Sequence, residues 1–255
     1  MCLIAAAWQA HPRWRLLLAG NRDEYHARPA APAARWDDAP EVLGGRDLEA
    51  GGTWIGVSER GRACVVTNFR DPRADRGGRS RGLLAAEFLR AGASAGAWSE
   101  ALAARAADYR PFNLLLFDRD SARYVGNHPA TRIAPLAPGV HGLSNGPLEA
   151  RWPKSERLTA ALRDWLARGE DDFAPLFAAL ADDAPAPDDA LPHTGIDLEL
   201  ERRLSAPFIR GERYGTRAST VIALAHDGGG VLIERRFGAG GRADGETVLR
   251  FVTQA

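Results

Sequence analysis

The sequence predicts a mixed α+β fold in which two antiparallel sheets are stacked and helices cover their outer faces. Segments typical of strands come first and last in the chain, over residues 3–68, 112–143 and 219–253. Segments with helical composition and spacing cluster between them, over residues 83–108 and 153–180. Alternating strand–helix units would indicate a parallel sheet, whereas this order favours sheets and helices in separate layers. No GxGxxG or phosphate-loop pattern follows a strand, so no motif supports nucleotide binding.

The strands expected in the first half of the chain are short apolar runs bounded by turn residues. They cover residues 3–8, 14–20, 53–58, 63–68, 112–117, 124–125, 132–136 and 140–143. The polar stretch that reaches Pro29 and Pro32 is expected to be a proline-rich loop, and paired glycines at 44–45 and 51–52 predict a tight, glycine-rich region. Residues 71–81 are charged and glycine-rich, which predicts a mobile surface loop.

Helices are expected over residues 83–90 and 97–108, which are rich in Ala and Leu. A longer helix begins at Pro153 and ends near Arg168, because its apolar residues fall at helical spacing. Asp171 and Asp172 can cap a further helix that ends at Leu180. An acidic, proline-rich loop is expected over residues 182–192, followed by strands at 219–225, 231–236 and 247–253.

Composition excludes several classes of protein. The chain has 255 residues, 33 acidic and 33 basic, so its net charge disfavours electrostatic binding to nucleic acid or to membrane surfaces. No apolar stretch is long enough to cross a bilayer and no basic region precedes the first apolar run, so a cytoplasmic protein is expected. Two cysteines make neither a disulfide framework nor a metal cluster. Lys154 is the single lysine, which we interpret as codon bias toward arginine.

Cys2 directly follows the initiator methionine, which is normally removed when the next residue is small. Removal would leave one residue with both a thiol and a free α-amino group, whose unperturbed pKa is about 7.7–8.0. Such an amine can act as the base that activates its own side chain. The alternative is that Cys2 is simply a small apolar residue that opens a strand.

The tetrapeptide from Asn21 to Glu24 follows the second apolar run. If the strand continues through it, Asn21 and Asp23 share one face, while Arg22 and Glu24 share the other. The first two strands pair as a hairpin, so this segment can lie beside Cys2, and a carboxylate there can orient the α-ammonium group. The alternative is a solvated turn with surface ion pairs of little energetic value.

Three further polar residues lie at the ends of apolar segments. Asn68 and Asn145 can each donate a side-chain N–H to a developing oxyanion, an interaction typically worth about 2.7–4 kcal/mol. The alternative for each is that it begins a turn, and this alternative is favoured for the Asn145–Gly146 pair. Arg217 can bind a substrate carboxylate in a bidentate manner or cap the sheet edge. The six histidines show no metal-ligand spacing, although a single histidine is enough to ligate haem iron.

Five segments carry a resemblance to a known family: MCLI, LAGNRDEYHARP, GGTWIGVSERGRACVVTNFRDP, GLSNGPLEARWPK and YGTRASTVIAL. Together, in this order and over nearly the whole chain, they resemble the NRDE-domain family, also called the transport and Golgi organisation 2 family. The family is similar to the N-terminal-nucleophile hydrolases. The resemblance therefore implies one domain over residues 1–255, built as a four-layer αββα sandwich.

The chemically defined relatives implied by this resemblance are the penicillin V acylases and bile salt hydrolases, which cleave amide bonds with an N-terminal cysteine. Their pattern implies Cys2 as nucleophile, with Asp23, Asn145 and Arg217 as the other catalytic residues. Asn21, Arg22 and Asn68 are the expected substrate-binding residues. In the acylases two residues separate an arginine from the aspartate, whereas here Arg22 and Asp23 are adjacent.

Two functions follow from the resemblance. The first is an N-terminal-cysteine hydrolase that cleaves a non-peptide amide bond of an unknown small molecule and requires no cofactor. The second is a non-catalytic carrier of haem or another apolar ligand, since eukaryotic members are connected with haem trafficking. A scaffold protein with a vestigial site is a third, weaker possibility.

Overall fold

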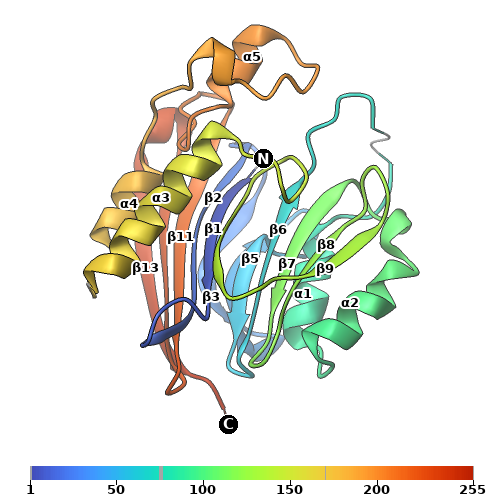
Figure 1. Cartoon of the computed structure of the whole chain (residues 1–255), viewed down its shortest axis with the longest axis vertical. Coiled ribbons are helices and arrows are strands. Elements are labelled where there is room, and N and C mark those ends of the chain that lie inside the picture. Colours follow the sequence, from blue (N-terminus) through green and yellow to red (C-terminus); the bar gives the residue numbers. More distant parts are fainter. Residues whose placement is uncertain (1, 75–76, 170, 255) are drawn as a thin grey trace.

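Two antiparallel sheets lie face to face between two layers of helices (Figure 1). The computed structural model describes residues 2–74, 77–169 and 171–254. It confirms the predicted four-layer αββα sandwich, with five α-helices among these residues. No helix within the described ranges is long and apolar enough to span a membrane.

The six-stranded sheet holds the chain's first two strands side by side in its interior. Its strand order is β10-β1-β2-β11-β12-β13. Strand β1 pairs with β2 so that Cys2 lies opposite Arg22, and β2 pairs with β11 so that Asp23 lies opposite Thr216. The bounds are β1 Cys2–Trp8, β2 Trp14–Tyr25, β10 Gly139–Leu143, β11 Tyr214–Ala225, β12 Gly229–Phe237 and β13 Ala243–Val252.

The seven-stranded sheet follows the chain order from β3 to β9. Each strand pairs with the next in an antiparallel manner, so the sheet is a continuous meander. The bounds are β3 Ala30–Trp36, β4 Ala39–Asp47, β5 Ile55–Ser58, β6 Arg62–Asn68, β7 Phe112–Phe117, β8 Ala122–Gly126 and β9 Arg132–Pro135.

Strands β3 and β4 lie where a proline-rich loop and a glycine-rich region were expected. β3 is the edge strand of its sheet, where a residue without an N–H such as Pro32 can face away from the ladder. In β4, a side chain on Gly45 would meet the Trp54 ring at 2.3 Å. Gly45 therefore allows a close approach of the Trp54 ring to the sheet.

Helices α1 and α2 cover the seven-stranded sheet, and α3 and α4 cover the six-stranded sheet. The short helix α5 was not predicted; it lies in the segment that joins α4 to β11. The bounds are α1 Gly82–Arg90, α2 Ala95–Ala103, α3 Pro153–Arg168, α4 Ala174–Leu180 and α5 Leu198–Arg203, with short 3₁₀ turns at Ala106–Asp108, Asp188–Ala190 and Ala239–Gly241.

The alternation of side chains along β1 and β2 decides which layer each site residue faces. Ile4 and Ala6 belong to the apolar core between the two sheets. Because side chains two residues apart share a face, Cys2 also faces the space between the sheets, and so does its cross-strand partner Arg22. Asp23 faces the opposite way, toward the helical layer, as the sequence predicted for adjacent residues of one strand.

Candidate functional site

Cys2 lies in the wall of a small cavity of about 160 Å³, here named the inner cavity. The side chain is buried, with 8% of its surface exposed. Arg22, Asp23 and Asn68 line the same cavity, so the structure brings four of the predicted site residues together. The remaining wall is formed by Glu24, Arg28, Asp47, Glu49, Ala50, Thr53, Trp54, Val66, Ser80, Arg81, Gly82 and Arg110.

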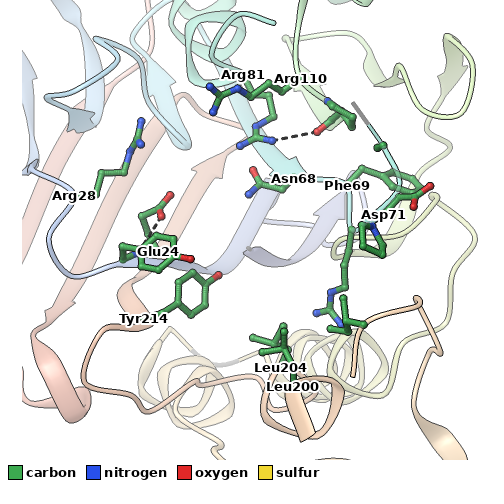
Figure 2. A pocket seen from close by; sticks show the side chains of 16 residues that line it. Glu24, Arg28, Asn68, Phe69, Asp71, Arg81, Arg110, Leu200, Leu204 and Tyr214 are labelled. Carbon is green, nitrogen blue, oxygen red and sulfur yellow. Dashed lines mark hydrogen bonds between the residues drawn. The ribbon is translucent and has the colours of Figure 1, made fainter. Parts of the chain in front are cut away.

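A larger cavity of about 500 Å³, here named the outer cavity, adjoins the first (Figure 2). Figure 2 shows arginine side chains on one side of it, Leu200 and Leu204 on the other, and Asn68 between them. The two cavities share five lining residues, so they lie next to each other. The shared residues are Glu24, Arg28, Asn68, Arg81 and Arg110.

Opposing effects act on the Cys2 thiol. Burial raises its pKa, because the thiolate loses solvation by water, and the negative charge of Asp23 raises it further. The positive charge of Arg22 and a hydrogen bond from the Asp23 backbone lower that pKa. Arg22 is fixed in place, since its Cζ atom lies 4.4 Å from the centre of the Trp54 ring and its Nη2 atom 4.0 Å from Asp47 Oδ2. Arg22 is therefore positioned to favour the reactive thiolate.

The Asp23 carboxylate is almost completely buried, with 1% of the residue exposed. Thr216 donates its hydroxyl hydrogen to Asp23 Oδ1 at 2.7 Å, and Tyr214 donates to the Asp23 carbonyl oxygen at 3.2 Å. Burial raises the pKa of the Asp23 carboxyl, while the charge of Lys154 and the Thr216 hydrogen bond lower it. The carboxylate thus depends on these neighbours to remain ionised.

Asn21 lies on the same face of β2 as Asp23, as the alternation predicted, but it lines neither the inner nor the outer cavity. Its amide nitrogen donates to the carbonyl oxygens of Leu180 and Pro207 at 2.8 and 2.9 Å. Its amide oxygen accepts a hydrogen bond from Ser219. These contacts join β2 to the end of α4, to the segment that precedes β11 and to β11 itself, so Asn21 stabilises the position of β2.

The two candidate oxyanion donors lie in contact with each other. Asn145 is fully buried, and its Nδ2 atom donates to the Asn68 carbonyl oxygen at 2.9 Å. Ser144 donates to the Cys2 carbonyl oxygen at 2.9 Å, which joins the Asn145 segment to the start of β1. Asn68 lines both cavities, whereas Asn145 lines neither. Asn68 therefore presents its side chain to a ligand, and Asn145 fixes the Asn68 backbone.

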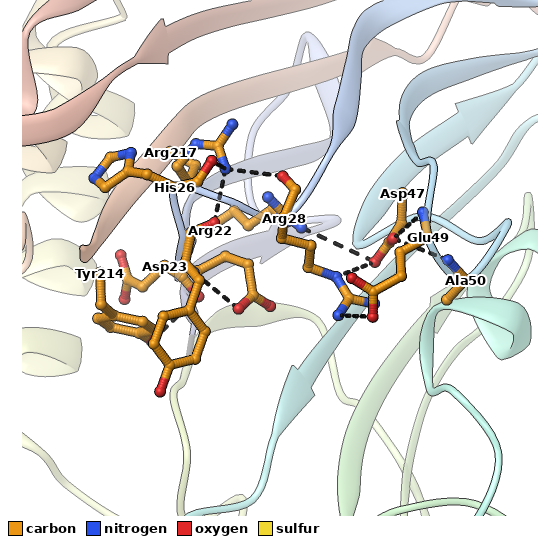
Figure 3. A network of polar contacts seen from close by, with 11 residues as sticks. Arg22, Asp23, His26, Arg28, Asp47, Glu49, Ala50, Tyr214 and Arg217 are labelled. Carbon is orange, nitrogen blue, oxygen red and sulfur yellow. Dashed lines mark hydrogen bonds and ion pairs between the residues drawn. The ribbon is translucent and has the colours of Figure 1, made fainter.

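Arg217 lies at the bulge in β11, next to Thr216. Its Nη1 atom donates to the carbonyl oxygens of Tyr25, His26 and Arg28, at 2.9, 3.2 and 3.1 Å (Figure 3). Arg217 is not part of the wall of either cavity. The guanidinium group thus holds the turn that follows β2, and through it the backbone of Arg28.

Sequence reasoning missed Arg81 and Arg110, which lie where the two cavities meet. Residues 71–81 were expected to be a mobile surface loop, yet Arg81 immediately precedes α1 and burial lowers its pKa, with the nearby Arg110 charge adding to the effect. Within the described ranges, neither arginine forms an ion pair with a carboxylate. The charge of the 71–81 segment was a usable signal, but the sequence does not show which charges converge.

Comparison with known sequences identifies the family. The family model described as Transport and Golgi organisation 2 matches residues 1–239. A Transport and Golgi organization protein 2 homolog of Bos taurus is 35% identical over 255 residues, covering 92% of each chain. The homolog of Homo sapiens is 32% identical over 258 residues, again covering 92% of each chain.

Comparison with solved structures identifies the fold. A mutant of conjugated bile acid hydrolase from Clostridium perfringens superposes with a TM-score of 0.53 at 12% identity, covering 99% of this chain and 92% of the other. Another variant of that enzyme gives a TM-score of 0.55 at 12% identity, covering 98% and 92%. These similarities show the N-terminal-nucleophile hydrolase fold, and the family match confirms the resemblance read from the sequence: the chain belongs to the Transport and Golgi organisation 2 family.

Proposed function

We propose that this protein is a cysteine amidohydrolase of the N-terminal-nucleophile type, which cleaves a non-peptide amide bond of a small molecule. The observation that carries the proposal is the position of Cys2, which shares the wall of the inner cavity with Arg22, Asp23 and Asn68. A nucleophile, a cation that favours its thiolate and an amide donor thus line one cavity, and these are groups that acyl transfer uses.

The reaction requires that Met1 be removed, so that Cys2 carries the free α-amine. The Cys2 sulfur attacks the amide carbonyl carbon and forms an S–C bond, while its proton passes to the α-amine. Asn68 donates to the oxyanion. The α-ammonium then gives its proton to the departing nitrogen as the C–N bond breaks, and water hydrolyses the resulting thioester.

The outer cavity indicates what kind of substrate fits. Its volume of about 500 Å³ falls within the range that accommodates small organic molecules. Leu200 and Leu204 offer an apolar surface, whereas Arg81 and Arg110 give the shared mouth a positive charge. This wall favours an amide that has an apolar acyl part and a carboxylate close to the scissile bond.

The experiment begins with the intact mass of the purified protein, which reports whether Met1 has been removed. Wild type, Cys2→Ala and Cys2→Ser are then assayed against a panel of N-acyl amino acids by mass spectrometry of the products. Cys64→Ala is the matched control, because Cys64 is the other cysteine and lies fully buried in the core beneath α1. We expect cleavage by wild type and Cys64→Ala, and loss of cleavage in Cys2→Ala.

Two results contradict the proposal. Complete retention of Met1 in active protein would show that no free α-amine takes part. Equal cleavage by wild type and Cys2→Ala would assign the activity to another group or to a contaminant.

The haem-carrier alternative receives no support from the cavity walls. Among the described residues that line the inner and outer cavities there is no histidine. Cys2, which is able to ligate iron, lies in a cavity of about 160 Å³, below the range of volumes that accommodate drug-sized ligands. The residues present therefore do not fit a haem ligated at this site.

A further inference from the structure

Lys154 is the one lysine among 33 lysine and arginine residues of the chain. Codon bias explains why the other basic positions are arginine, and it makes the single exception informative. Lysine and arginine are not interchangeable where a cation is buried, because a guanidinium group carries five donors and stays charged. Codon bias therefore does not explain the lysine at position 154.

Lys154 is the second residue of α3, and 1% of its surface is exposed. Its Nζ atom makes no hydrogen bond with any described residue. The ionisable groups that act on it are Asp23, Arg70, Cys2 and Glu201, taken in order of their strength. An ammonium group buried in this way is expensive in free energy, so its presence beside the site indicates a function.

The other buried charges nearby already have partners. Arg70 Nη1 donates to Glu201 Oε2 at 2.8 Å, and both side chains are less than one-tenth exposed. Glu201 Oε1 also accepts hydrogen bonds from the backbone and the hydroxyl of Thr194. Arg70 and Glu201 thus neutralise each other, and Lys154 and Asp23 are a second pair of buried, opposite charges that act on each other.

We propose that Lys154 is a positioning residue whose ammonium group keeps the Asp23 carboxylate ionised and available to the mature amino terminus of Cys2. The proposal rests on the proposed amidohydrolase function. Lys154 is the strongest of the charges that favour the Asp23 carboxylate against its burial. The hydroxyl of Tyr214, which also faces Asp23, is kept neutral because burial raises its pKa, so it adds no competing charge.

We expect the same charge to act on the amine that receives the Cys2 proton, because Lys154 and Cys2 interact electrostatically. Burial lowers the pKa of Lys154 to about 8, so the ammonium form still dominates at pH 7. A positive charge near the α-amine favours the neutral form of that amine, which is the form that accepts a proton. Lys154 therefore offsets the opposite effect of the Asp23 carboxylate on the same amine.

Substitution of Lys154 by methionine removes the charge and keeps an unbranched side chain. Loss of the cation raises the pKa of the Asp23 carboxyl and of the Cys2 α-amine alike. Both changes move the acid limb of the kcat/KM profile of Lys154→Met to higher pH, by about one unit. Lys154→Arg retains the charge, so its acid limb stays where the wild type has it, even if its kcat is lower.

The matched control is Arg163→Met, which removes one exposed cation from the same helix. We expect its acid limb to coincide with that of the wild type. An acid limb shared by wild type and Lys154→Met would overturn the proposal. So would an equal shift in Lys154→Met and Lys154→Arg, because the charge would then not be the cause.

A second measurement does not depend on catalysis. Incorporation of lysine labelled with carbon-13 at Cε gives one lysine signal, whose chemical shift reports the titration of Lys154 directly. We expect a midpoint near pH 8 in the wild type and a lower midpoint in Asp23→Asn, which removes the anion that favours the ammonium form. A midpoint at the ordinary lysine value, or one that Asp23→Asn leaves unchanged, would overturn the coupling.

The two measurements separate this inference from the proposed function. Titration near pH 8 with sensitivity to Asp23→Asn, together with no amide cleavage by any preparation with a free Cys2, would retain the Lys154–Asp23 coupling and reject the hydrolase. Amide cleavage with the same acid limb in wild type and Lys154→Met would retain the hydrolase and reject the role proposed for Lys154.

Discussion

Thr216 offers a test of the buried network that does not require a substrate. Its hydroxyl accepts a hydrogen bond from the Ile209 backbone at 2.9 Å and donates one to Asp23 Oδ1 at 2.7 Å. Thr216→Val keeps the shape of the side chain and removes both bonds. A hydrogen bond to a charged group contributes about 1.5–3 kcal/mol, and a buried N–H left without a partner costs about 1–3 kcal/mol.

We therefore expect Thr216→Val to lower the free energy of unfolding by about 3–5 kcal/mol, measured by urea denaturation with an unchanged m value. Thr216→Ser retains the hydroxyl and is the matched control, with an expected loss of about 1 kcal/mol for the missing methyl group. A Thr216→Val protein as stable as Thr216→Ser would refute the inference that this hydroxyl supports a buried Asp23 carboxylate.

Three further predictions concern the charges around the site. Arg22→Leu removes a cation that lowers the pKa of the Cys2 thiol, so the pH midpoint of its alkylation by iodoacetamide moves upward; an unchanged midpoint contradicts the placement of Arg22. Arg110→Gln raises KM for N-acyl amino acids several-fold and leaves KM for the corresponding uncharged amides unchanged; equal effects on both contradict an anion-binding mouth. Because burial lowers the pKa of Lys154 from 10.5 to about 8, the folded protein binds fewer protons than the unfolded chain between these values. The unfolding free energy of wild type relative to Lys154→Met is therefore lowest below pH 8 and rises by up to about 3 kcal/mol toward pH 10.5, as urea titrations at several pH values can measure.

Local patterns predicted most of the elements. The helix at Pro153–Arg168 has the bounds that its apolar spacing and its N-terminal proline indicated. The strand that contains the Asn21–Glu24 tetrapeptide extends through it, so the opposite faces of Arg22 and Asp23 follow from alternation alone. Period and turn residues are local properties, and they are visible without knowledge of the rest of the chain.

Strand β3 shows where local reading failed. Pro29 and Pro32 suggest a loop, because proline cannot donate a hydrogen bond to a sheet ladder. Whether a strand lies at the edge of a sheet depends on partners far away in the sequence. β3 is an edge strand, where a proline without an N–H does not interrupt the ladder. The same reasoning applies to Gly45 in β4, whose purpose is visible only against the Trp54 ring.

Sequence patterns alone predicted the layer architecture, the family and a buried strand that begins beside Cys2. The three-dimensional arrangement was needed to show that Arg22 shares the Cys2 cavity and that Arg217 supports a turn outside it. The structure also shows that Lys154, the single lysine of the sequence, is a buried cation that interacts with the buried Asp23 carboxylate. The physical reason is that desolvation and charge pairing depend on distances between groups on different elements, which neither period nor composition encodes.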